Sequence, residues 1–320
     1  MTDQLSLWTN AWFPDDVARL LREGTSNYHQ VNARDMSTEE AKDALREADI
    51  AWGQPDADTL LAAPRLRWVH ITSAGYTSYD RDDLKAALRA RGALLTNSSG
   101  VYDEPCAQHV LAMMLADARQ LLMSYQTQIG DRDWHAGERR ADSYLLGGQA
   151  VLILGFGAIA QRLVQLLAPF DMKIVALRRQ AKGDENVPII GENQLFDALK
   201  EADHVVNILP ESDATRGFLN RERFAAMKPG ARFYNIGRGA TVDQNALREG
   251  LMSGALELAY LDVTDPEPLP ADHALWTAPN CFITPHTAGG HKGEMERLAR
   301  HFLRNLRLFE NGDQLINRVF

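Results

Sequence analysis

The feature that most constrains the fold of this chain is a regular alternation of short β-rich runs with amphipathic helical runs. In the N-terminal part, the pattern predicts strands at residues 5–9, 28–31, 49–53, 67–72 and 93–97. It predicts helices, with acidic or capping residues at their starts, at residues 14–24, 37–48 and 80–92. Strands that alternate with helices indicate a parallel, doubly wound sheet.

A second alternating series begins at residue 150 and predicts a second domain. Its strands are expected at residues 150–155, 173–177, 204–209, 231–237, 257–263 and 281–284. Six parallel strands are what a Rossmann dinucleotide-binding domain needs. A chain of 320 residues is long enough for two domains of ordinary size. The expected fold class is therefore α/β, with two doubly wound parallel-sheet domains.

A long helical pattern at residues 103–129 connects the two series. Its apolar positions follow helical spacing at Leu111, Met114, Leu115, Ala118, Leu121, Leu122 and Tyr125. This stripe is expected either to face the core or to form a subunit interface. Residues 130–148 lose the periodicity, and their charges, glycines and lone Trp134 predict a surface arm. The tail predicts one amphipathic helix over residues 293–312.

Composition sets the class of protein and excludes several partners. Hydrophobic residues make up 45% of the chain and charged residues 24%, which is ordinary for a soluble globular enzyme. The formal net charge of -9 repels nucleic acid and anionic membranes. The N-terminus lacks the pattern of a signal peptide, and no run approaches the roughly 20 apolar residues of a membrane helix. We therefore expect a cytoplasmic protein with no nucleic-acid partner and no membrane partner.

The segment GFGAIA at residues 155–160 has the GxGxxA form of a dinucleotide-binding turn between a predicted strand and a predicted helix. Gly155 permits the tight turn, Gly157 lets the backbone approach a pyrophosphate, and the small Ala160 allows helix and strand to pack closely. The helix N-terminus offers free N–H groups for the phosphates. A glycine-rich turn that binds nothing is the alternative interpretation. The expected cofactor-binding residues in this turn are Gly155, Phe156, Gly157, Ala158 and Ile159.

The type of cofactor is predicted from the residues that follow the next strand. NAD-binding folds place Asp or Glu about 20 residues after the first glycine, whereas NADP-binding folds place Arg near the 2′-phosphate. In this chain Arg178 occupies that place and Arg179 follows it. A guanidinium pairs with a phosphate through two N–H donors, and an acidic residue would repel it. NADP(H) is therefore the expected cofactor and NAD(H) the second choice, with two solvated loop arginines as the alternative.

Three chemically matched residues follow three predicted strands of the second series. Arg238 lies between two glycines, Glu267 between two prolines, and His286 directly after a proline. The carboxyl ends of parallel strands form the edge where open α/β sheets bind ligands. Each residue alone has an ordinary explanation as a surface arginine, a solvated acid or a buried histidine. Together at one sheet edge they indicate an active site.

The chain resembles the D-isomer-specific 2-hydroxyacid dehydrogenases nearly from end to end. Besides the glycine turn, the resemblance rests on NILPESDATRGFLNRERFAAMKPGARFYNIGRG (207–239), LDVTDPEP (261–268) and TPHTAGG (284–290), in the family's order. Within the family the chain is similar to NADPH-preferring glyoxylate/hydroxypyruvate reductases, mainly through Arg178 and Arg179. The resemblance implies hydride transfer between NADPH and a small 2-keto acid or D-2-hydroxy acid. Glyoxylate, hydroxypyruvate, phenylpyruvate-like and branched keto acids all fit this class of substrate.

The resemblance implies a role for each residue at the sheet edge. His286 is the acid/base that gives a proton to the carbonyl oxygen of the 2-keto acid, and imidazole suits this because it changes protonation near neutral pH. Glu267 hydrogen-bonds the other ring nitrogen, which sets the tautomer and favours the protonated form. Arg238 holds the substrate carboxylate or carbonyl and stabilises the developing alkoxide.

The resemblance also implies further binding residues. Asp262 matches the position that contacts the nicotinamide carboxamide. The backbone N–H groups of Ala74 and Gly75, in the segment TSAGY, are expected to take the substrate carboxylate. Trp52 is expected either to line the substrate pocket or to lie in the core. Further cofactor contacts are expected at Leu209, Pro210, Thr215 and Ile236.

The domain organisation implied by the resemblance is discontinuous. Residues 1–99 plus 288–320 form a flavodoxin-like substrate-binding domain, and residues 100–287 form the Rossmann NAD(P)-binding domain. A helical arm at about residues 103–145 resembles the family's dimerisation element, so a homodimer is expected. The substrate is expected in the cleft between the domains, where closure excludes water.

Four positions depart from the family's pattern. Ala160 replaces the third glycine of the turn, which the packing tolerates. Arg178 replaces the usual Asp, which argues against NAD without threatening the fold. Gln108 stands where glutamate is common and has no functional interpretation. Thr287 stands where an aliphatic residue is usual, next to an intact catalytic histidine.

Other classes of protein agree less well with the sequence. Cys106 and Cys281 have no paired spacing, and His286 and His291 belong to no metal-binding motif, so no metal site is expected. The GxSxG elbow of serine hydrolases is absent from the sequence. Glu267 argues against a formate-dehydrogenase relative, which would carry Gln there. A nucleotide-sensing interaction protein on the same fold, as in the corepressor branch of the family, is the alternative function.

Overall fold

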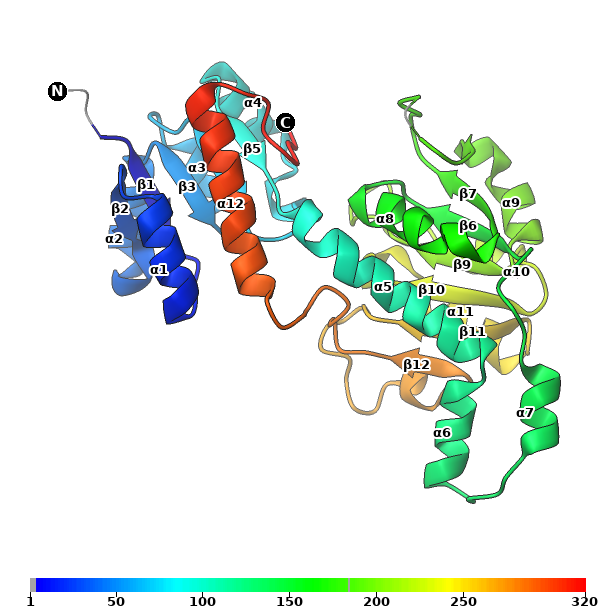
Figure 1. Ribbon diagram of the computed structural model, residues 1–320. Helices are drawn as coiled ribbons and strands as arrows, with labels where there is room; N and C mark the ends of the chain where they lie inside the picture. Colours follow the sequence, from blue (N-terminus) through cyan, green and yellow to red (C-terminus); the bar gives the residue numbers. More distant parts are fainter. Residues whose placement is uncertain (1–3, 184) are drawn as a thin grey trace. The chain divides into compact units, whose positions relative to one another are not determined.

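The computed structural model of the protein describes residues 4–183 and 185–320 and divides the chain into two compact units. Unit 1 consists of Met1–Tyr102 and Gly290–Phe320, and unit 2 consists of Asp103–Gly289 (Figure 1). The chain therefore returns to unit 1 for its last helix. The domain boundaries predicted after residues 99 and 287 lie near these bounds, and the roles assigned to the two domains stay predictions.

Unit 1 is built on a five-stranded parallel sheet in the order β2-β1-β3-β4-β5. Its strands are β1 (Ser6–Thr9), β2 (His29–Asn32), β3 (Ile50–Gly53), β4 (Trp68–Ile71) and β5 (Leu94–Thr96). Each strand overlaps a run predicted from the sequence. β3 and β4 are buried along their whole length, as expected for the middle of a parallel sheet with helices on both faces.

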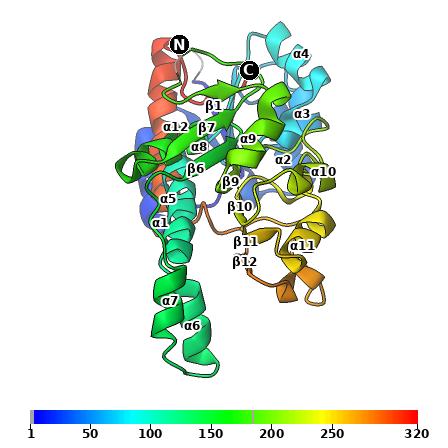
Figure 2. The same cartoon turned by 90° about the vertical axis from the view of Figure 1, so that its right-hand side faces the viewer.

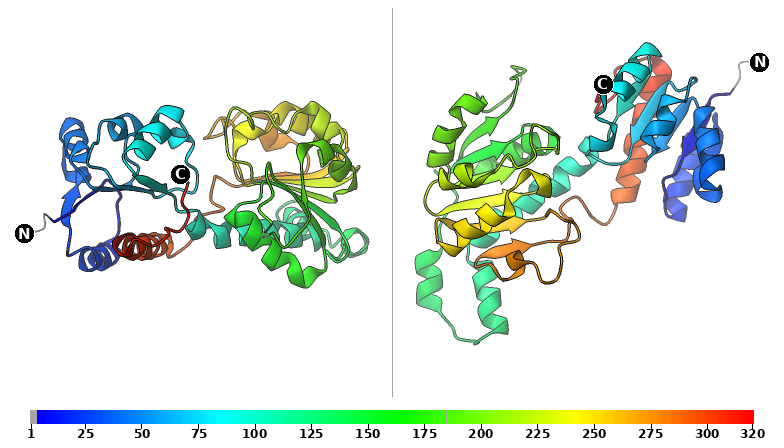
Figure 3. Two further views of the ribbon diagram at one scale, coloured as in Figure 1. Left: turned by 90° about the horizontal axis from the view of Figure 1, so that it is seen from above. Right: turned by 180° about the vertical axis from the view of Figure 1, so that it is seen from behind.

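Helices cover both faces of the unit 1 sheet. They are α1 (Asp15–Gly24), α2 (Thr38–Arg46), α3 (Ala57–Leu61), α4 (Asp82–Ala90) and α12 (Glu294–Asn311). α1 and α12 pack on one face, and α2, α3 and α4 pack on the other (Figure 3). A capping box starts α2: the Ser37 side chain accepts from the Glu40 backbone N–H, and the Glu40 side chain accepts from the Ser37 backbone N–H. α3 was not predicted because a helix of five residues has too little periodicity to recognise.

The last helix, α12, is amphipathic as predicted. Leu298, Phe302 and Leu306 are buried in unit 1, and Gly312, with φ of 72°, ends the helix. In the described part of the chain, no helix is both long enough and apolar enough to cross a membrane.

Unit 2 contains a seven-stranded parallel sheet in the order β12-β11-β10-β9-β6-β7-β8 (Figure 2). Its strands are β6 (Ala150–Leu154), β7 (Lys173–Leu177), β8 (Ile189–Ile190), β9 (His204–Asn207), β10 (Ala231–Asn235), β11 (Leu256–Leu261) and β12 (Cys281–Ile283). The connecting helices include α8 (Ala158–Leu167), α9 (Leu195–Glu201), α10 (Arg221–Ala225) and α11 (Gln244–Met252). All six predicted strands are present, and only the two-residue β8 was missed. The strand order reverses between β6 and β9, which is where open α/β sheets bind ligands.

The single long helix predicted at residues 103–129 is wrong. The structure has two helices, α5 (Ser99–Ala118) and α6 (Leu121–Ile129), and Gln120 between them has a left-handed φ of 55°. The Ala118 carbonyl at the end of α5 accepts a hydrogen bond from the Tyr144 backbone N–H at 2.9 Å. This partner comes from a distant part of the chain, so the helical periodicity of the sequence does not reveal where α5 ends.

The apolar stripe is buried in α5 and exposed in α6, so the expectation of a core contact holds for α5 and that of a subunit interface stays a prediction for α6. Met114 and Ala118 are buried at 0% and 1% exposure, whereas Leu121 and Tyr125 are exposed at 57% and 59%. The α5 part of the stripe therefore faces the core, and the α6 part is uncovered. α6 and α7 (Ala136–Asp142) form the arm, which projects from the sheet of unit 2 (Figure 2).

Candidate active site

The glycine turn connects β6 to α8 at the reversal point of the unit 2 sheet. Gly155 has φ of 95°, and a Cβ there would lie 3.1 Å from the Ile208 carbonyl oxygen, so conformation and space both exclude a side chain. A Cβ on Gly157 would meet nothing within 4 Å, so this part of the turn faces open space. Gly157 is also the N-cap of α8 and supplies no side-chain cap. The first N–H groups of α8 therefore suit a phosphate.

The other residues of the turn differ in their burial. Ala160 is fully buried at 0% exposure, as expected for a small residue where helix and sheet pack closely. Phe156 is also buried, at 5% exposure. Ala158 and Ile159 are partly exposed in the first turn of α8. The turn is therefore packed against the protein at Phe156 and Ala160 and open at Gly157.

Arg178 follows β7 directly and is held at the end of the sheet. Its backbone N–H donates to the Ile190 carbonyl in β8 at 3.2 Å. Its Nη1 donates to Glu185 Oε1 at 2.7 Å, and the Arg178 side chain is 18% exposed. Arg179, the next residue, is exposed. Arg178 is therefore not a freely solvated loop arginine.

The remaining predicted cofactor residues lie just after β9 and β10. The Leu209 N–H donates to Asn207 Oδ1 at 3.3 Å, and the Ile236 N–H donates to the Asn207 carbonyl at 3.1 Å. The Thr215 hydroxyl donates to the Pro210 carbonyl at 2.6 Å. β9 lies next to β6 on the side away from β7, and β10 lies next to β9, so these residues share the sheet edge that holds the glycine turn.

A buried polar network that the sequence analysis missed supports this edge. Asn207 Nδ2 donates to Asn235 Oδ1 at 3.0 Å and to Thr241 Oγ1 at 2.8 Å. Asn235 Oδ1 also accepts from the Gly237 N–H, and the Thr241 hydroxyl donates to the Arg238 carbonyl at 2.6 Å. All three polar side chains are at most 1% exposed, so their hydrogen bonds fix the surrounding backbone. The sequence hints at this network only through an Asn at the end of each of two strand-like runs, residues 204–207 and 231–235.

The loop that carries Arg238 is packed backbone to backbone against its neighbours. A Cβ on Gly237 would lie 2.7 Å from the Leu209 carbonyl oxygen, and one on Gly239 would lie 1.9 Å from the Thr264 carbonyl oxygen. The two glycines therefore let this loop contact the loops that follow β9 and β11. Arg238 Nη1 donates to the Gly237 carbonyl at 2.7 Å, which holds the guanidinium close to its own loop.

Gly239→Ala tests this packing. We expect it to destabilise the protein by about 1–3 kcal/mol or more, because the new Cβ overlaps a backbone carbonyl that cannot move as a side chain can. The thermal denaturation midpoint measures the change. Gly137→Ala in α7 is the matched control, since a Cβ there meets nothing within 4 Å. A Gly239→Ala variant with an unchanged midpoint would contradict the close approach.

His286 and Glu267 form the central pair of the site. His286 Nδ1 lies 2.8 Å from Glu267 Oε2, and Glu267 Oε1 accepts from the Thr264 backbone N–H at 3.0 Å. The His286 and Glu267 side chains are 51% and 37% exposed, so the pair is accessible. His286 has a left-handed φ of 53°, which is uncommon for a residue with a side chain. Its N–H donates to the Asp262 carbonyl at 2.8 Å, which helps to hold this conformation.

Asp262 holds the segment around His286 in place through hydrogen bonds. Its Oδ1 accepts from the Thr284 hydroxyl at 2.5 Å and from the Thr287 N–H at 2.8 Å. Its Oδ2 accepts from the Ala288 N–H at 2.9 Å, and the residue is 3% exposed. A carboxylate offers about four acceptor positions, so these three donors leave capacity for one more.

His109 and Tyr260 lie behind Asp262 and were not predicted. His109 Nε2 lies 3.3 Å from Thr284 Oγ1, 3.1 Å from the Tyr260 hydroxyl and 3.8 Å from Asp262 Oδ1. Burial lowers the pKa of His109, although the negative charge of Asp262 opposes this shift. The ring is therefore neutral at neutral pH and links α5 to the loop after β12. No sequence periodicity marks this contact, because the residues come from three separate elements.

A cavity of about 410 Å³ lies beside the His286–Glu267 pair. Its apolar walls come from Pro268, Leu269, Trp276, Ile283 and Pro285, and Asp262 also lines it. The Trp276 indole N–H donates to the Pro270 carbonyl at 2.9 Å, which fixes one wall. The acid/base pair therefore borders a partly apolar space.

The predicted substrate residues of unit 1 have different environments. The Ala74 carbonyl accepts from Asn97 Nδ2 at 2.7 Å, and the Gly75 carbonyl accepts from the Ser73 hydroxyl at 2.6 Å. Their backbone N–H groups donate to no other residue in the described part of the chain. Trp52 is 2% exposed and stacks on Phe302 with ring centroids 4.0 Å apart. Trp52 is thus part of the core, which was the second of the two expectations for it.

The comparisons with known proteins agree on one family. The family model described as D-isomer specific 2-hydroxyacid dehydrogenase, NAD binding domain, matches residues 111–288. Glyoxylate reductase from Pyrococcus furiosus is 31% identical over 291 residues, covering 88% of this chain and 83% of that enzyme. Glyoxylate/hydroxypyruvate reductase B from Pectobacterium carotovorum is 35% identical over 241 residues, covering 73% and 72%. The D-isomer specific 2-hydroxyacid dehydrogenase from Xanthobacter autotrophicus Py2 has a TM-score of 0.81 at 26% identity, covering 99% and 98%.

The fold and these relatives define the class of protein: it is an NAD(P)-dependent oxidoreductase. Because the family model spans more than half of the chain, the chain belongs to the D-isomer-specific 2-hydroxyacid dehydrogenase family. The family acts on small 2-hydroxy or 2-keto acids. The resemblance seen in the sequence and the fold of two parallel-sheet α/β domains are both confirmed.

Proposed function

We propose that this enzyme reduces glyoxylate, hydroxypyruvate or a related small 2-keto acid and prefers NADPH to NADH. The observation that carries the proposal is the His286–Glu267 hydrogen bond of 2.8 Å at the sheet edge that also holds the glycine turn. The two relatives named glyoxylate reductase and glyoxylate/hydroxypyruvate reductase B support this class of substrate. The further support is that Arg238, Glu267 and His286 match the family's motifs in the sequence.

In the proposed reaction, the reduced nicotinamide, when bound, supplies a hydride to the carbonyl carbon. His286 donates a proton from Nε2 to the carbonyl oxygen, so that a C–H and an O–H bond form as the carbonyl π bond breaks. Glu267 accepts the Nδ1–H hydrogen bond, which leaves Nε2 as the ring atom for the transfer. Arg238 binds the carboxylate or carbonyl and stabilises negative charge on the oxygen. The N–H groups of Ala74 and Gly75 are proposed to take the substrate carboxylate.

The residues of unit 2 fit a dinucleotide. The open space at Gly157 and the uncapped N-terminus of α8 suit the pyrophosphate, with Phe156, Ala158 and Ile159 around it. Arg178, with Arg179 beside it, is proposed to bind the 2′-phosphate. The Xanthobacter autotrophicus relative is described in complex with NADPH, which supports this preference.

The other cofactor contacts are proposed on the same edge. Asp262 would accept from the carboxamide of the nicotinamide through its remaining acceptor position. Leu209, Pro210, Thr215 and Ile236 would border the cofactor after β9 and β10.

Initial-rate measurements test the proposed function. The oxidation of NADPH and of NADH is followed separately with glyoxylate, hydroxypyruvate and phenylpyruvate. We expect turnover with glyoxylate or hydroxypyruvate and a higher kcat/KM with NADPH than with NADH. Tight cofactor binding without turnover of any 2-keto acid would contradict the proposal and favour the nucleotide-sensing alternative.

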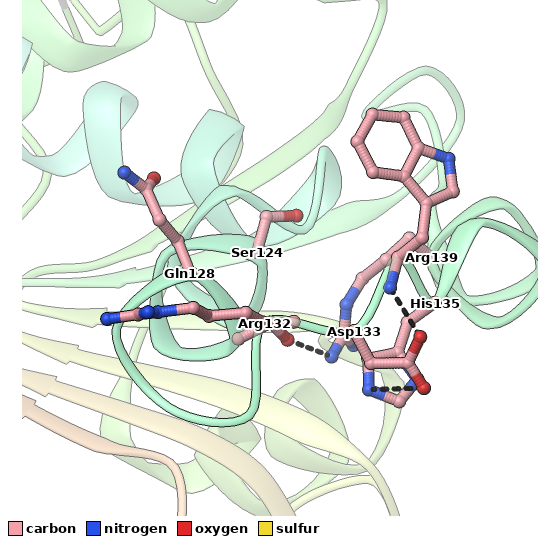
Figure 4. A pocket seen from close by; sticks show the side chains of 8 residues that line it. Ser124, Gln128, Arg132, Asp133, His135 and Arg139 are labelled. Atoms are coloured by element: carbon pink, nitrogen blue, oxygen red, sulfur yellow. Dashed lines mark hydrogen bonds and ion pairs between the residues drawn. The ribbon is translucent and has the colours of Figure 1, made fainter.

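We also infer a homodimer formed through the arm. Leu121, Tyr125 and Ile129 on α6 are 57%, 59% and 64% exposed, and Leu145 is 75% exposed, so the arm presents apolar side chains to solvent. A hollow of about 770 Å³ at the arm is lined by Trp134 and by polar residues that include Arg132 (Figure 4). A second copy of the chain would cover these surfaces. Sedimentation equilibrium measures the mass, and a monomer at micromolar concentration would refute the inference.

A further inference from the structure

Three N–H donors converge on one carboxylate in the loop between β7 and β8. Glu185 Oε1 accepts from Arg178 Nη1 and from the Lys182 backbone N–H, both at 2.7 Å. Glu185 Oε2 accepts from the Gly183 backbone N–H at 2.8 Å. Gly183 has φ of 83°, a conformation that helps to turn successive N–H groups toward one anion. A guanidinium and two backbone N–H groups are also the donors that a phosphate uses.

This ion pair is not formed by two solvated side chains. The Arg178 and Glu185 side chains are 18% and 4% exposed, whereas those of the Arg221–Glu249 pair in the same unit are 65% and 52% exposed. The hydrogen bond from the Lys182 N–H, together with the other donors, lowers the pKa of Glu185. The carboxylate is therefore ionised at neutral pH, and a negative charge stands beside the arginine at the end of β7.

We infer that Glu185 is a specificity-determining residue that competes with the 2′-phosphate of NADPH for Arg178. The inference rests on the proposed function, in which Arg178 binds that phosphate. Arg178 has five N–H donors, and Glu185 engages one of them. A phosphate that contacts the same guanidinium comes within a few ångströms of the carboxylate, and like charges at that distance repel each other.

The competition acts on one cofactor only. NADH carries a neutral hydroxyl where NADPH carries the phosphate, so the charge of Glu185 does not oppose its binding. Glu185 therefore reduces the preference for NADPH that Arg178 alone would produce.

Glu185→Gln tests the inference, with Glu192→Gln as the matched control. Gln keeps the length of the side chain and removes the charge. Its one amide oxygen can accept from Arg178 and the Lys182 N–H, whereas its NH2 group replaces the oxygen that accepts from the Gly183 N–H. Glu192 forms an ion pair with Arg223 in the same unit, so the control removes the same charge from another Arg–Glu pair. Isothermal titration calorimetry on the full chain gives the Kd of NADPH, NADH, adenosine 2′,5′-bisphosphate and AMP.

We expect Glu185→Gln to bind NADPH and adenosine 2′,5′-bisphosphate about tenfold more tightly, with NADH and AMP changed by less than about twofold. Glu192→Gln is expected to match the wild type for all four ligands. Unchanged or weaker NADPH binding with intact NADH binding overturns the inference, and so does equal tightening of both cofactors.

If Glu185→Gln loses all four ligands, Glu185→Ala provides the same comparison without an amide NH2 group beside the Gly183 N–H. Two further results separate this inference from the proposed function. If NADPH binding is tighter than NADH binding in the wild type and Glu185 variants leave both unchanged, the inference fails while the proposed function stands. Wild-type protein that binds adenosine 2′,5′-bisphosphate no better than AMP refutes the proposed role of Arg178 and the inference with it.

Discussion

His286→Ala is expected to abolish turnover of 2-keto acids while cofactor binding stays nearly unchanged. The substitution removes the only imidazole that is hydrogen-bonded to Glu267 in the described part of the chain. Loss of a positioned general acid lowers kcat by roughly 10²- to 10⁴-fold. Because His286 is assigned to proton transfer and not to cofactor binding, the Kd of NADPH is expected to change by less than about threefold, on the order of 0.6 kcal/mol. Steady-state rates and calorimetry measure the two quantities.

An exposed histidine of unit 1 provides the control. His29 is exposed in the edge strand β2, and His29→Ala is expected to keep wild-type rates. If His286→Ala retained wild-type kcat with NADPH and glyoxylate or hydroxypyruvate, its role as the acid would be wrong. Loss of cofactor binding in the same variant would instead show that the residue supports the fold of the cofactor site.

Arg178→Asp is expected to weaken NADPH binding by about 100-fold and NADH binding far less. A hydrogen bond to a charged group contributes about 1.5–3 kcal/mol, so losing the guanidinium alone accounts for a large part of this change. The new carboxylate adds repulsion toward the 2′-phosphate, beside the existing charge of Glu185. NADH has no phosphate there, so neither effect applies to it. Calorimetric titration with each cofactor measures the difference.

Arg221→Asp is the matched control for this charge reversal. Arg221 is an exposed arginine of the same unit, paired with Glu249 and 65% exposed. We expect its variant to bind both cofactors as the wild type does. Equal weakening of NADPH and NADH in Arg178→Asp would show that Arg178 does not meet the 2′-phosphate.

Most of the fold was predictable because it depends on local periodicity. Buried parallel strands and amphipathic helices repeat over several residues, and every predicted strand is present in the two sheets. The missed elements, α3 and β8, have five and two residues, which is too short for a period to be recognised. The wrong prediction, one helix over residues 103–129, failed because Tyr144 caps the Ala118 carbonyl from outside the helix.

The candidate site was predictable as a set of residue types and not as a set of contacts. Arg238, Glu267 and His286 were identified from their chemistry at the ends of strands and from the family resemblance. Their surroundings include Asp262 and Thr284, and the hydrogen bonds of these two residues fasten the histidine segment. Such contacts join residues from different elements, so no single stretch of sequence encodes their distances.

The sequence by itself determined the alternation of strands with helices, the glycine turn, and the residues able to carry out proton transfer, because these follow from local pattern and side-chain chemistry. Only the tertiary structure decided that Trp52 lies in the core, that the α6 face is uncovered, and that Glu185 holds Arg178. The physical reason is that burial and hydrogen bonding depend on which distant segments pack together. A charged residue such as Glu185 looks like any solvated acid until the loop folds three N–H donors around it.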